Sequence, residues 1–113
     1  MQALSLMNDV TYVEAARRLA ERMMTEGGET PDERIAYAYL LATAHRPPPR
    51  AANILVQGYD RHFERYQVDR AAALALVTQG QSVRDQTLDV AELASYTMVA
   101  NLILNFDGTI TKE

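Results

Sequence analysis

The segment LDVAELASYTMVANLILNFDG, residues 88–108, is the most apolar stretch of the chain. A helix that begins at Asp89 places apolar side chains around most of its circumference between Leu93 and Phe106. Asp89 and Glu92 have the spacing of an N-terminal cap and mark where this helix starts. Because a helix that is apolar all round must be covered all round, we expect residues 89–106 to form a central helix. Amphipathic helices of the same chain wrap it, or it lies between two protomers.

Four other segments carry helical patterns with start and stop signals. Residues 11–26 end at a glycine pair, and residues 30–46 begin with Thr30, Pro31 and Glu33, a second capping arrangement. Three prolines, 47–49, form a corner before a helix over 50–66, and Asp69 caps a short helix that ends near Gly80. The sequence therefore predicts an all-α, compact bundle of about five helices with the C-terminal helix central. We expect one domain over 1–113, with an apolar lead-in over 1–8, a surface loop over 80–89 and an extended tail over 109–113.

Composition narrows the classes of protein to which the chain can belong. With 113 residues, 48% hydrophobic and 23% charged, it is expected to fold as one ordinary globular domain. It contains no cysteine, which excludes disulfides and thiolate metal sites. No apolar run approaches the roughly 20 residues that span a bilayer, and no signal peptide is recognisable at the N-terminus. These features predict no membrane segment and, for the chain as written, a cytoplasmic location.

Neither the charge pattern nor the titratable residues indicate catalysis or nucleic-acid binding. The net charge is −4, and acids are interleaved with nearly every group of arginines, so we expect no nucleic-acid partner. The acids that could act in pairs each have an arginine within three or four residues, as is usual on solvated helix faces; they are Glu14, Glu21, Asp60 and Glu64. His45 and His62 have no neighbour at metal-ligand spacing. The sequence therefore predicts no catalytic residue, no cofactor and no metal site.

Seven residues are candidates for interaction or ligand binding. Asn101 and Asn105 share one face of the last helix, where buried amides fix its register against a neighbouring segment or hold a ligand. Tyr37 and Tyr39 offer rings for stacking, although most tyrosines fall on stripes assigned to the core. The proline corner is rigid and basic, and we expect His45 to lie in the last turn of the preceding helix. Its candidate docking residues are His45, Arg46 and Arg50.

Three segments together resemble a known family. They are QALSLMND at the N-terminus, AYLLATAHRPPP at the corner, and the pattern LD-x-AEL-x-x-x-T-x-VA-x-x-x-LN-x-D over 88–107. The chain is similar to the C-terminal part of domain of unknown function 1553. The resemblance implies relatives that are large exported bacterial proteins of planctomycete type, often with cytochrome-c-like domains. Family members usually have Gly-Arg where this chain has Ala44 and His45. The family has no established activity, so Asn105 and Asp107 carry over only as motif positions.

These observations lead to three functional expectations. The first is a non-enzymatic structural or interaction module that forms a homodimer, because a free-standing chain of this kind, such as the product of a mobile gene cassette, leaves a packing surface uncovered. The second is a domain that binds a small molecule or glycan through the tyrosines and the two asparagines. The third is an accessory fragment of a larger redox or polysaccharide-processing protein, which depends on the family resemblance alone.

Overall fold

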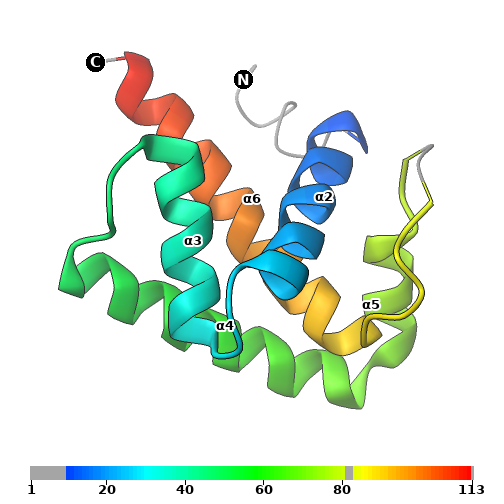
Figure 1. Ribbon diagram of the computed structural model, residues 1–113. Helices are drawn as coiled ribbons and strands as arrows, with labels where there is room; N and C mark the ends of the chain where they lie inside the picture. Colours follow the sequence, from blue (N-terminus) through cyan, green and yellow to red (C-terminus); the bar gives the residue numbers. More distant parts are fainter. Residues whose placement is uncertain (1–9, 81–82, 113) are drawn as a thin grey trace.

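Helix α6 (Val90–Lys112) crosses the middle of the molecule, and four other helices pack against it (Figure 1). The computed structural model describes residues 10–80 and 83–112, with side chains for 13–80 and 83–105. Every regular element in these ranges is a helix, and those surrounding α6 are α2 (Val10–Glu26), α3 (Pro31–Thr43), α4 (Pro49–Val68) and α5 (Arg70–Val77). The structure confirms the predicted all-α bundle of five helices with the C-terminal helix central.

The first half of α6 is the most deeply buried part of the protein. Ala91 and the five consecutive residues from Leu93 to Thr97 are each at most 1% exposed. Two of these carry hydroxyl groups, and both are satisfied inside the helix: Ser95 donates to the Ala91 carbonyl and Thr97 to the Leu93 carbonyl, each at 2.7 Å. The helix can therefore be surrounded by apolar side chains without leaving these hydroxyl groups unpaired.

The covering of α6 is incomplete beyond Ala100. Ile103 remains 1% exposed, but Leu102 is 47% exposed, so one side of the helix is open to solvent there. Helices of the same chain thus cover the first half of residues 89–106 as expected but leave Leu102 open, and cover of Leu102 by a second protomer stays a prediction. The reason is that α2 and α5 cover the first half from one side, whereas near Leu102 the hollow described below separates α6 from α4.

Capping residues fix the starts of three helices. The Thr30 hydroxyl accepts a hydrogen bond from the Glu33 N–H at 3.2 Å, and Pro31 occupies the first turn of α3. The Asp69 and Asp89 carboxylates accept from the N–H groups of Ala72 and Glu92 at 3.1 and 2.9 Å, as predicted for the starts of α5 and α6. The lead-in predicted over 1–8 lies outside the described residues.

Two predicted boundaries were wrong. Helix α3 ends at Thr43, because Ala44 adopts a left-handed conformation with φ of 65°, so His45 does not lie in the last turn of the helix. Helix α6 continues to Lys112, so residues 109–112 are helical rather than an extended tail, and residue 113 lies outside the described range. Gly108 does not stop the helix, since a single glycine disfavours a helix by only about 1 kcal/mol.

One charged residue that the sequence placed on the surface lies in the core. Arg17 of α2 is 1% exposed, and its guanidinium lies 3.1 Å from the Glu21 carboxylate and 3.9 Å from that of Glu14. Glu21 also accepts the backbone N–H of Asp85 at 2.8 Å, so the loop after α5 lies over this side of α2. Gly80 packs directly against Glu14. The loop after α5 therefore covers a face of α2 that the helical pattern of the sequence predicts to be exposed to solvent.

We expect Arg17→Ala to destabilise the protein by about 3 kcal/mol, because it leaves two partly buried carboxylates without their cation. The matched control is Arg22→Ala on the same helix, whose 3.4 Å pair with Glu26 is more than half exposed on both sides and should change stability by less than about 1 kcal/mol. Urea unfolding followed by circular dichroism measures both values. Equal losses for the two variants would contradict a structural role for the buried pair.

Candidate functional site

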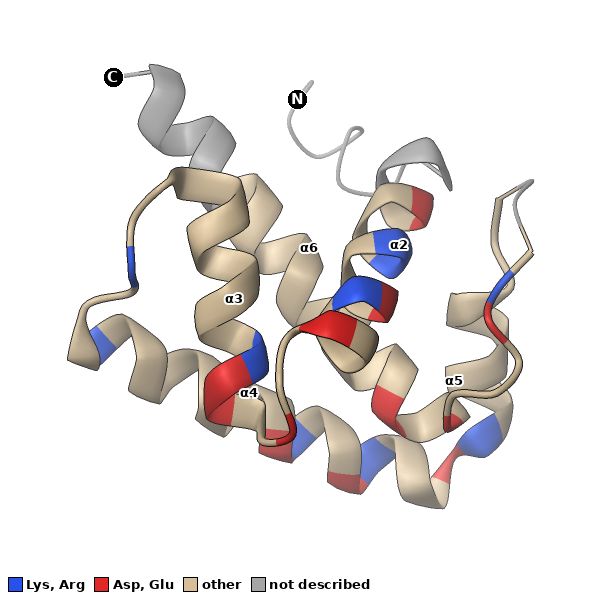
Figure 2. Cartoon of the chain, in the orientation of Figure 1, with Lys and Arg blue, Asp and Glu red and all other residues tan. Residues whose placement is uncertain are grey.

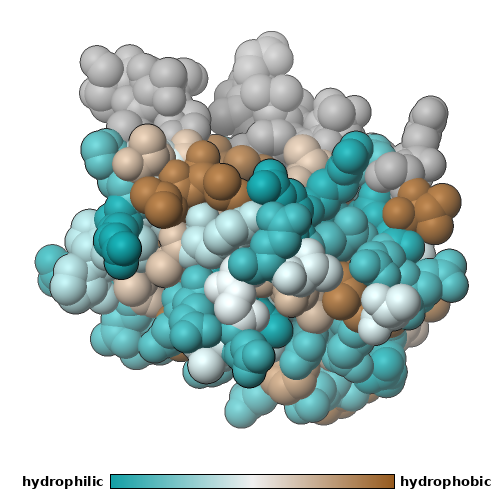
Figure 3. Space-filling model, in the orientation of Figure 1, coloured by the Kyte–Doolittle hydropathy of each residue, from teal (hydrophilic) through white to brown (hydrophobic). Residues whose placement is uncertain are grey.

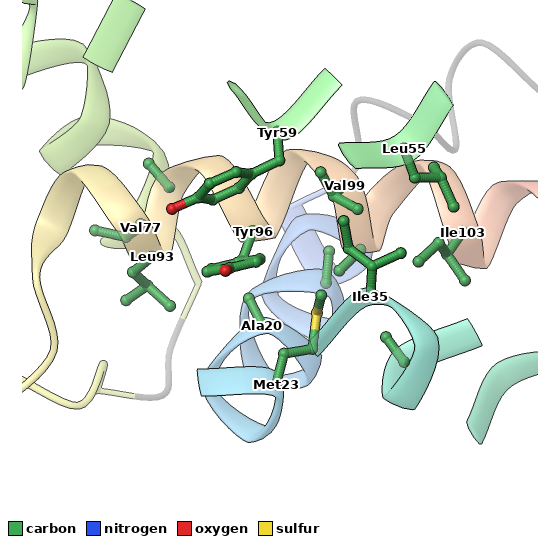
Figure 4. Packing of buried hydrophobic residues seen from close by; sticks show 14 of the residues in the cluster. Ala20, Met23, Ile35, Leu55, Tyr59, Val77, Leu93, Tyr96, Val99 and Ile103 are labelled. Atoms are coloured by element: carbon green, nitrogen blue, oxygen red, sulfur yellow. The ribbon is translucent and has the colours of Figure 1, made fainter. Parts of the chain in front are cut away.

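A hollow of about 280 Å³ lies between α3, the first half of α4 and α6. Its wall is apolar and is formed by one residue of α3, three of α4 and two of α6: Tyr39, Ala51, Ile54, Leu55, Leu102 and Ile103. Leu55 and Ile103 are 7% and 1% exposed and form its buried part, and Figure 4 shows these two side chains on neighbouring helices. Ile54 and Leu102 are 57% and 47% exposed and form its rim.

The rim is unusual because large apolar side chains are normally covered. Leu40 and Leu41, which follow the lining residue Tyr39 on α3, are also about half exposed. Figure 3 shows an apolar area over the upper part of α3 in that view. Five of the seven large hydrophobic side chains that are exposed among the described residues therefore lie on the three helices that form the hollow: Leu40, Leu41, Ile54, Leu102 and, at the far end of α4, Val68. This clustering makes the hollow the best candidate for a binding surface in the described part of the chain.

The structure separates the two candidate tyrosines. Tyr39 is 7% exposed and lines the hollow, whereas Tyr37 lies on another side of α3 and donates a hydrogen bond to the Glu26 carboxylate at 2.5 Å. That hydrogen bond raises the pKa of Tyr37 and lowers the pKa of Glu26. The Arg22 guanidinium lies 6.0 Å from the Tyr37 ring centroid. Tyr37 thus ties α3 to the end of α2 and does not line the hollow.

The two asparagines do not line the hollow either. Asn101 and Asn105 are partly buried on α6. The Asn101 side-chain oxygen is buried, and it has no hydrogen-bond partner among the described residues, contrary to the expectation that each amide is satisfied. Of Tyr37, Tyr39 and Asn101, only Tyr39 lines the hollow, so the structure does not bring the three together, and the expected small-molecule or glycan binding stays a prediction.

The proline corner lies beside the hollow. Helix α4 begins at Pro49, and Arg50 precedes the rim residue Ile54 by four residues, so the two share one face of the helix. His45, Arg46 and Arg50 are all exposed. The His45 backbone N–H is held by the Thr43 hydroxyl at 3.2 Å. Figure 2 shows basic positions and no acidic ones at the corner between α3 and α4.

Sequence reasoning missed an arginine–tyrosine cluster that joins three helices. The Tyr59 and Tyr96 rings stack with centroids 4.3 Å apart, as the labelled side chains in Figure 4 illustrate. Arg34 donates to the Tyr96 hydroxyl at 3.4 Å and to the Gly28 carbonyl at 2.9 Å. Burial raises the pKa of both phenols, so they stay protonated and serve packing. The helical pattern around each of Tyr59 and Tyr96 predicted only that its side chain faces the core. Their pairing could not be predicted in this way, because it depends on how α4 crosses α6.

His62 on α4 has a pKa below its ordinary value. Burial lowers the pKa of this half-buried imidazole, and the neighbouring Arg61 and Arg65 act in the same direction. Its ring lies 6.4 Å from that of Tyr66. In the described residues, no three His, Asp or Glu side chains lie close enough together to hold a metal ion. His62 is therefore a titrating group at the edge of the core.

We expect acid to destabilise the protein partly through His62. A lowered pKa in the folded state means that the unfolded chain binds this proton more readily, so stability is lost as the pH falls through the ordinary value of 6.5. His62→Gln should therefore flatten the dependence of the free energy of unfolding on pH between about 7.5 and 5.5. His45→Gln, at an exposed position, is the control. An unchanged slope in His62→Gln would show that other groups cause the acid sensitivity.

These features define the class of protein as a helical domain with an apolar hollow beside a basic corner of the chain. The family model described as "Protein of unknown function (DUF1553)" matches residues 1–59, slightly more than half of the chain, and the chain belongs to this family. The match contains α2, α3, the proline corner and the α4 residues of the hollow, and it confirms the family resemblance seen in the sequence. That the chain corresponds to the C-terminal part of longer members stays a prediction.

Searches of curated proteins and of solved structures gave no match. None of the helices, over the residues that the structure describes, combines the length and the apolar character needed to cross a membrane. The features that bear on function are therefore the hollow and its rim.

Proposed function

We propose that this protein is a non-enzymatic helical interaction module that self-associates through the hollow face, defined here as Ile54, Leu102 and the hollow between them. The observation that carries this proposal is the exposure of these two large side chains on opposite sides of one concavity. Exposed apolar side chains gain free energy when a partner covers them, at about 25 cal/mol per Å² of buried apolar surface. Single exposed residues need no explanation, but a cluster around a concavity is typical of a binding surface.

A binding role also agrees with the state of the titratable groups. The partly buried acids Glu14 and Glu21 pair with Arg17, and the buried phenols of Tyr59 and Tyr96 are held protonated. The wall of the hollow is apolar, and acid–base catalysis needs a titratable group within hydrogen-bond reach of a bound substrate. These observations favour recognition over chemistry at the hollow.

The hollow favours a second candidate function, the binding of a small apolar molecule. Its volume of about 280 Å³ lies near the lower end of the range of ligand pockets, and its buried part is formed by Leu55 and Ile103 of neighbouring helices. Of the small-molecule and glycan ligands first expected, the apolar wall favours a small apolar molecule, because it offers no hydrogen bonds to sugar hydroxyl groups.

We expect the protein to form a dimer that the double variant Ile54→Glu, Leu102→Glu dissociates. Both side chains are about half exposed, so the fold should persist while the dissociation constant rises at least about tenfold, since each charge would be buried in the dimer. Light scattering after size-exclusion chromatography measures the mass, and circular dichroism checks the fold.

The matched control is Val68→Glu, an 89% exposed apolar residue at the far end of α4. It should leave the dimer intact. A wild-type protein that stays monomeric at high micromolar concentration, or an equal effect of Val68→Glu, would refute self-association through the hollow face.

A further inference from the structure

We infer that the hollow binds the apolar chain of a small carboxylate with about ten carbon atoms, whose carboxylate group lies toward Arg46 and Arg50. This inference rests on the second candidate function, ligand binding in the hollow, and names the chemical class of the ligand. It follows from three properties of the site, which are its volume, its apolar wall and the charge around it.

The volume sets the size of the ligand. A closed apolar cavity of about 150 Å³ accommodates benzene, with six carbon atoms. By proportion, a hollow of 280 Å³ accommodates roughly ten non-hydrogen atoms. It is too small for a helix, whose diameter with side chains is about 10 Å. A single alkyl chain or one aromatic ring with a short substituent fits this volume.

The wall of the hollow determines the polarity of the part of the ligand that binds there. The lining surface is apolar, and Leu55 and Ile103 keep its buried part closed to solvent. Each methylene group moved from water into such surroundings raises affinity about fourfold. Affinity should therefore rise with chain length until the hollow is full.

The charge around the hollow determines the charge of the ligand's polar group. Residues 34–59 and 93–106, which include all of the lining residues, contain no Asp or Glu, although the chain as a whole has a net charge of −4. The charged residues in these two segments are Arg34, Arg46 and Arg50. Arg34 already binds the Gly28 carbonyl and Tyr96. Figure 2 shows basic positions without acidic ones at the corner that joins α3 to α4.

Two of these arginines are available to a ligand. Among the described residues, neither Arg46 nor Arg50 makes a side-chain hydrogen bond or an ion pair, in contrast to Arg17 and Arg22. Arg50 lies one helical turn before the rim residue Ile54. Helix α4 starts without a side-chain cap at Pro48, so its N-terminal dipole adds potential of the same sign. The apolar hollow is thus next to the most acid-free, basic part of the chain, which suits an anionic amphiphile.

The test compares decanoate with decanol, which has the same chain length and no charge. Isothermal titration calorimetry should give saturable 1:1 binding of decanoate, below its micelle concentration, with decanol bound more weakly. Arg50→Gln should lower decanoate affinity about two- to fivefold and leave decanol affinity unchanged, because an exposed ion pair contributes modestly. Arg61→Gln, an exposed arginine beyond the hollow on the same helix, is the control and should change neither. Hexanoate and octanoate should bind progressively more weakly than decanoate.

A second pair of variants locates the ligand. Ala51→Leu fills the hollow from α4 and should weaken both probes, and Ile54→Gln, at a 57% exposed position, tests the same wall if the first variant does not fold. Decanoate affinity that neither variant lowers would overturn the assignment of the site.

Three further outcomes separate this inference from the candidate function on which it rests. Equal affinity for decanol and decanoate, with no effect of Arg50→Gln, would refute the carboxylate class but leave ligand binding in the hollow intact. No binding of either probe to wild-type protein, at a concentration where light scattering shows a monomer, would refute both. Displacement of decanoate by a short apolar, glutamate-bearing peptide of higher affinity would identify an acidic segment as the occupant and overturn the inference.

Discussion

Burial of α6 between Leu93 and Ala100 is the constraint on which the arrangement of the other helices depends. A helix satisfies its own backbone hydrogen bonds, so an apolar helix can be enclosed on all sides without unpaired polar groups. The closest cover comes from α2, whose facing residues are small: Ala16 and Ala20 are fully buried, as are Ala94 and Ala100 of α6. Alanines on both helices allow their backbones to approach closely, and the larger Met23 and Ile35 fill the space at the end of this contact.

Polar side chains connect the loops to this apolar centre. Glu21 joins the buried Arg17 to the backbone of Asp85, and Arg34 joins the stacked tyrosines to the carbonyl of Gly28. In both places one charged group satisfies several partners at the edge of the core, where an unpaired one would be costly. The loops at 27–30 and 83–89 are thus positioned by side chains from helices that precede or follow them.

Features that depend on residues close in the sequence were predicted correctly, whereas features that depend on distant residues were not. The starts of α3, α5 and α6 depend on residues three apart, such as Asp69 with Ala72, and were predicted correctly. The burial of Arg17 and the pairing of Tyr59 with Tyr96 depend on contacts between residues 64 and 37 positions apart, which no local pattern encodes. The candidate site was foreseen in part, since Tyr39 lines the hollow and Arg50 lies beside it. Asn101 and Tyr37 were included because they are polar or aromatic, although their helical positions direct them elsewhere.

The left-handed conformation of Ala44 has a consequence for the corner between α3 and α4. Residues with a Cβ atom adopt this region at a cost of roughly 1 to 2 kcal/mol, which glycine avoids. The three prolines that follow shortly afterwards fix the backbone on the other side. The connection between α3 and α4 is therefore conformationally restricted. This restriction favours a fixed separation of the two helices, which carry Tyr39 and Ile54 on the wall of the hollow.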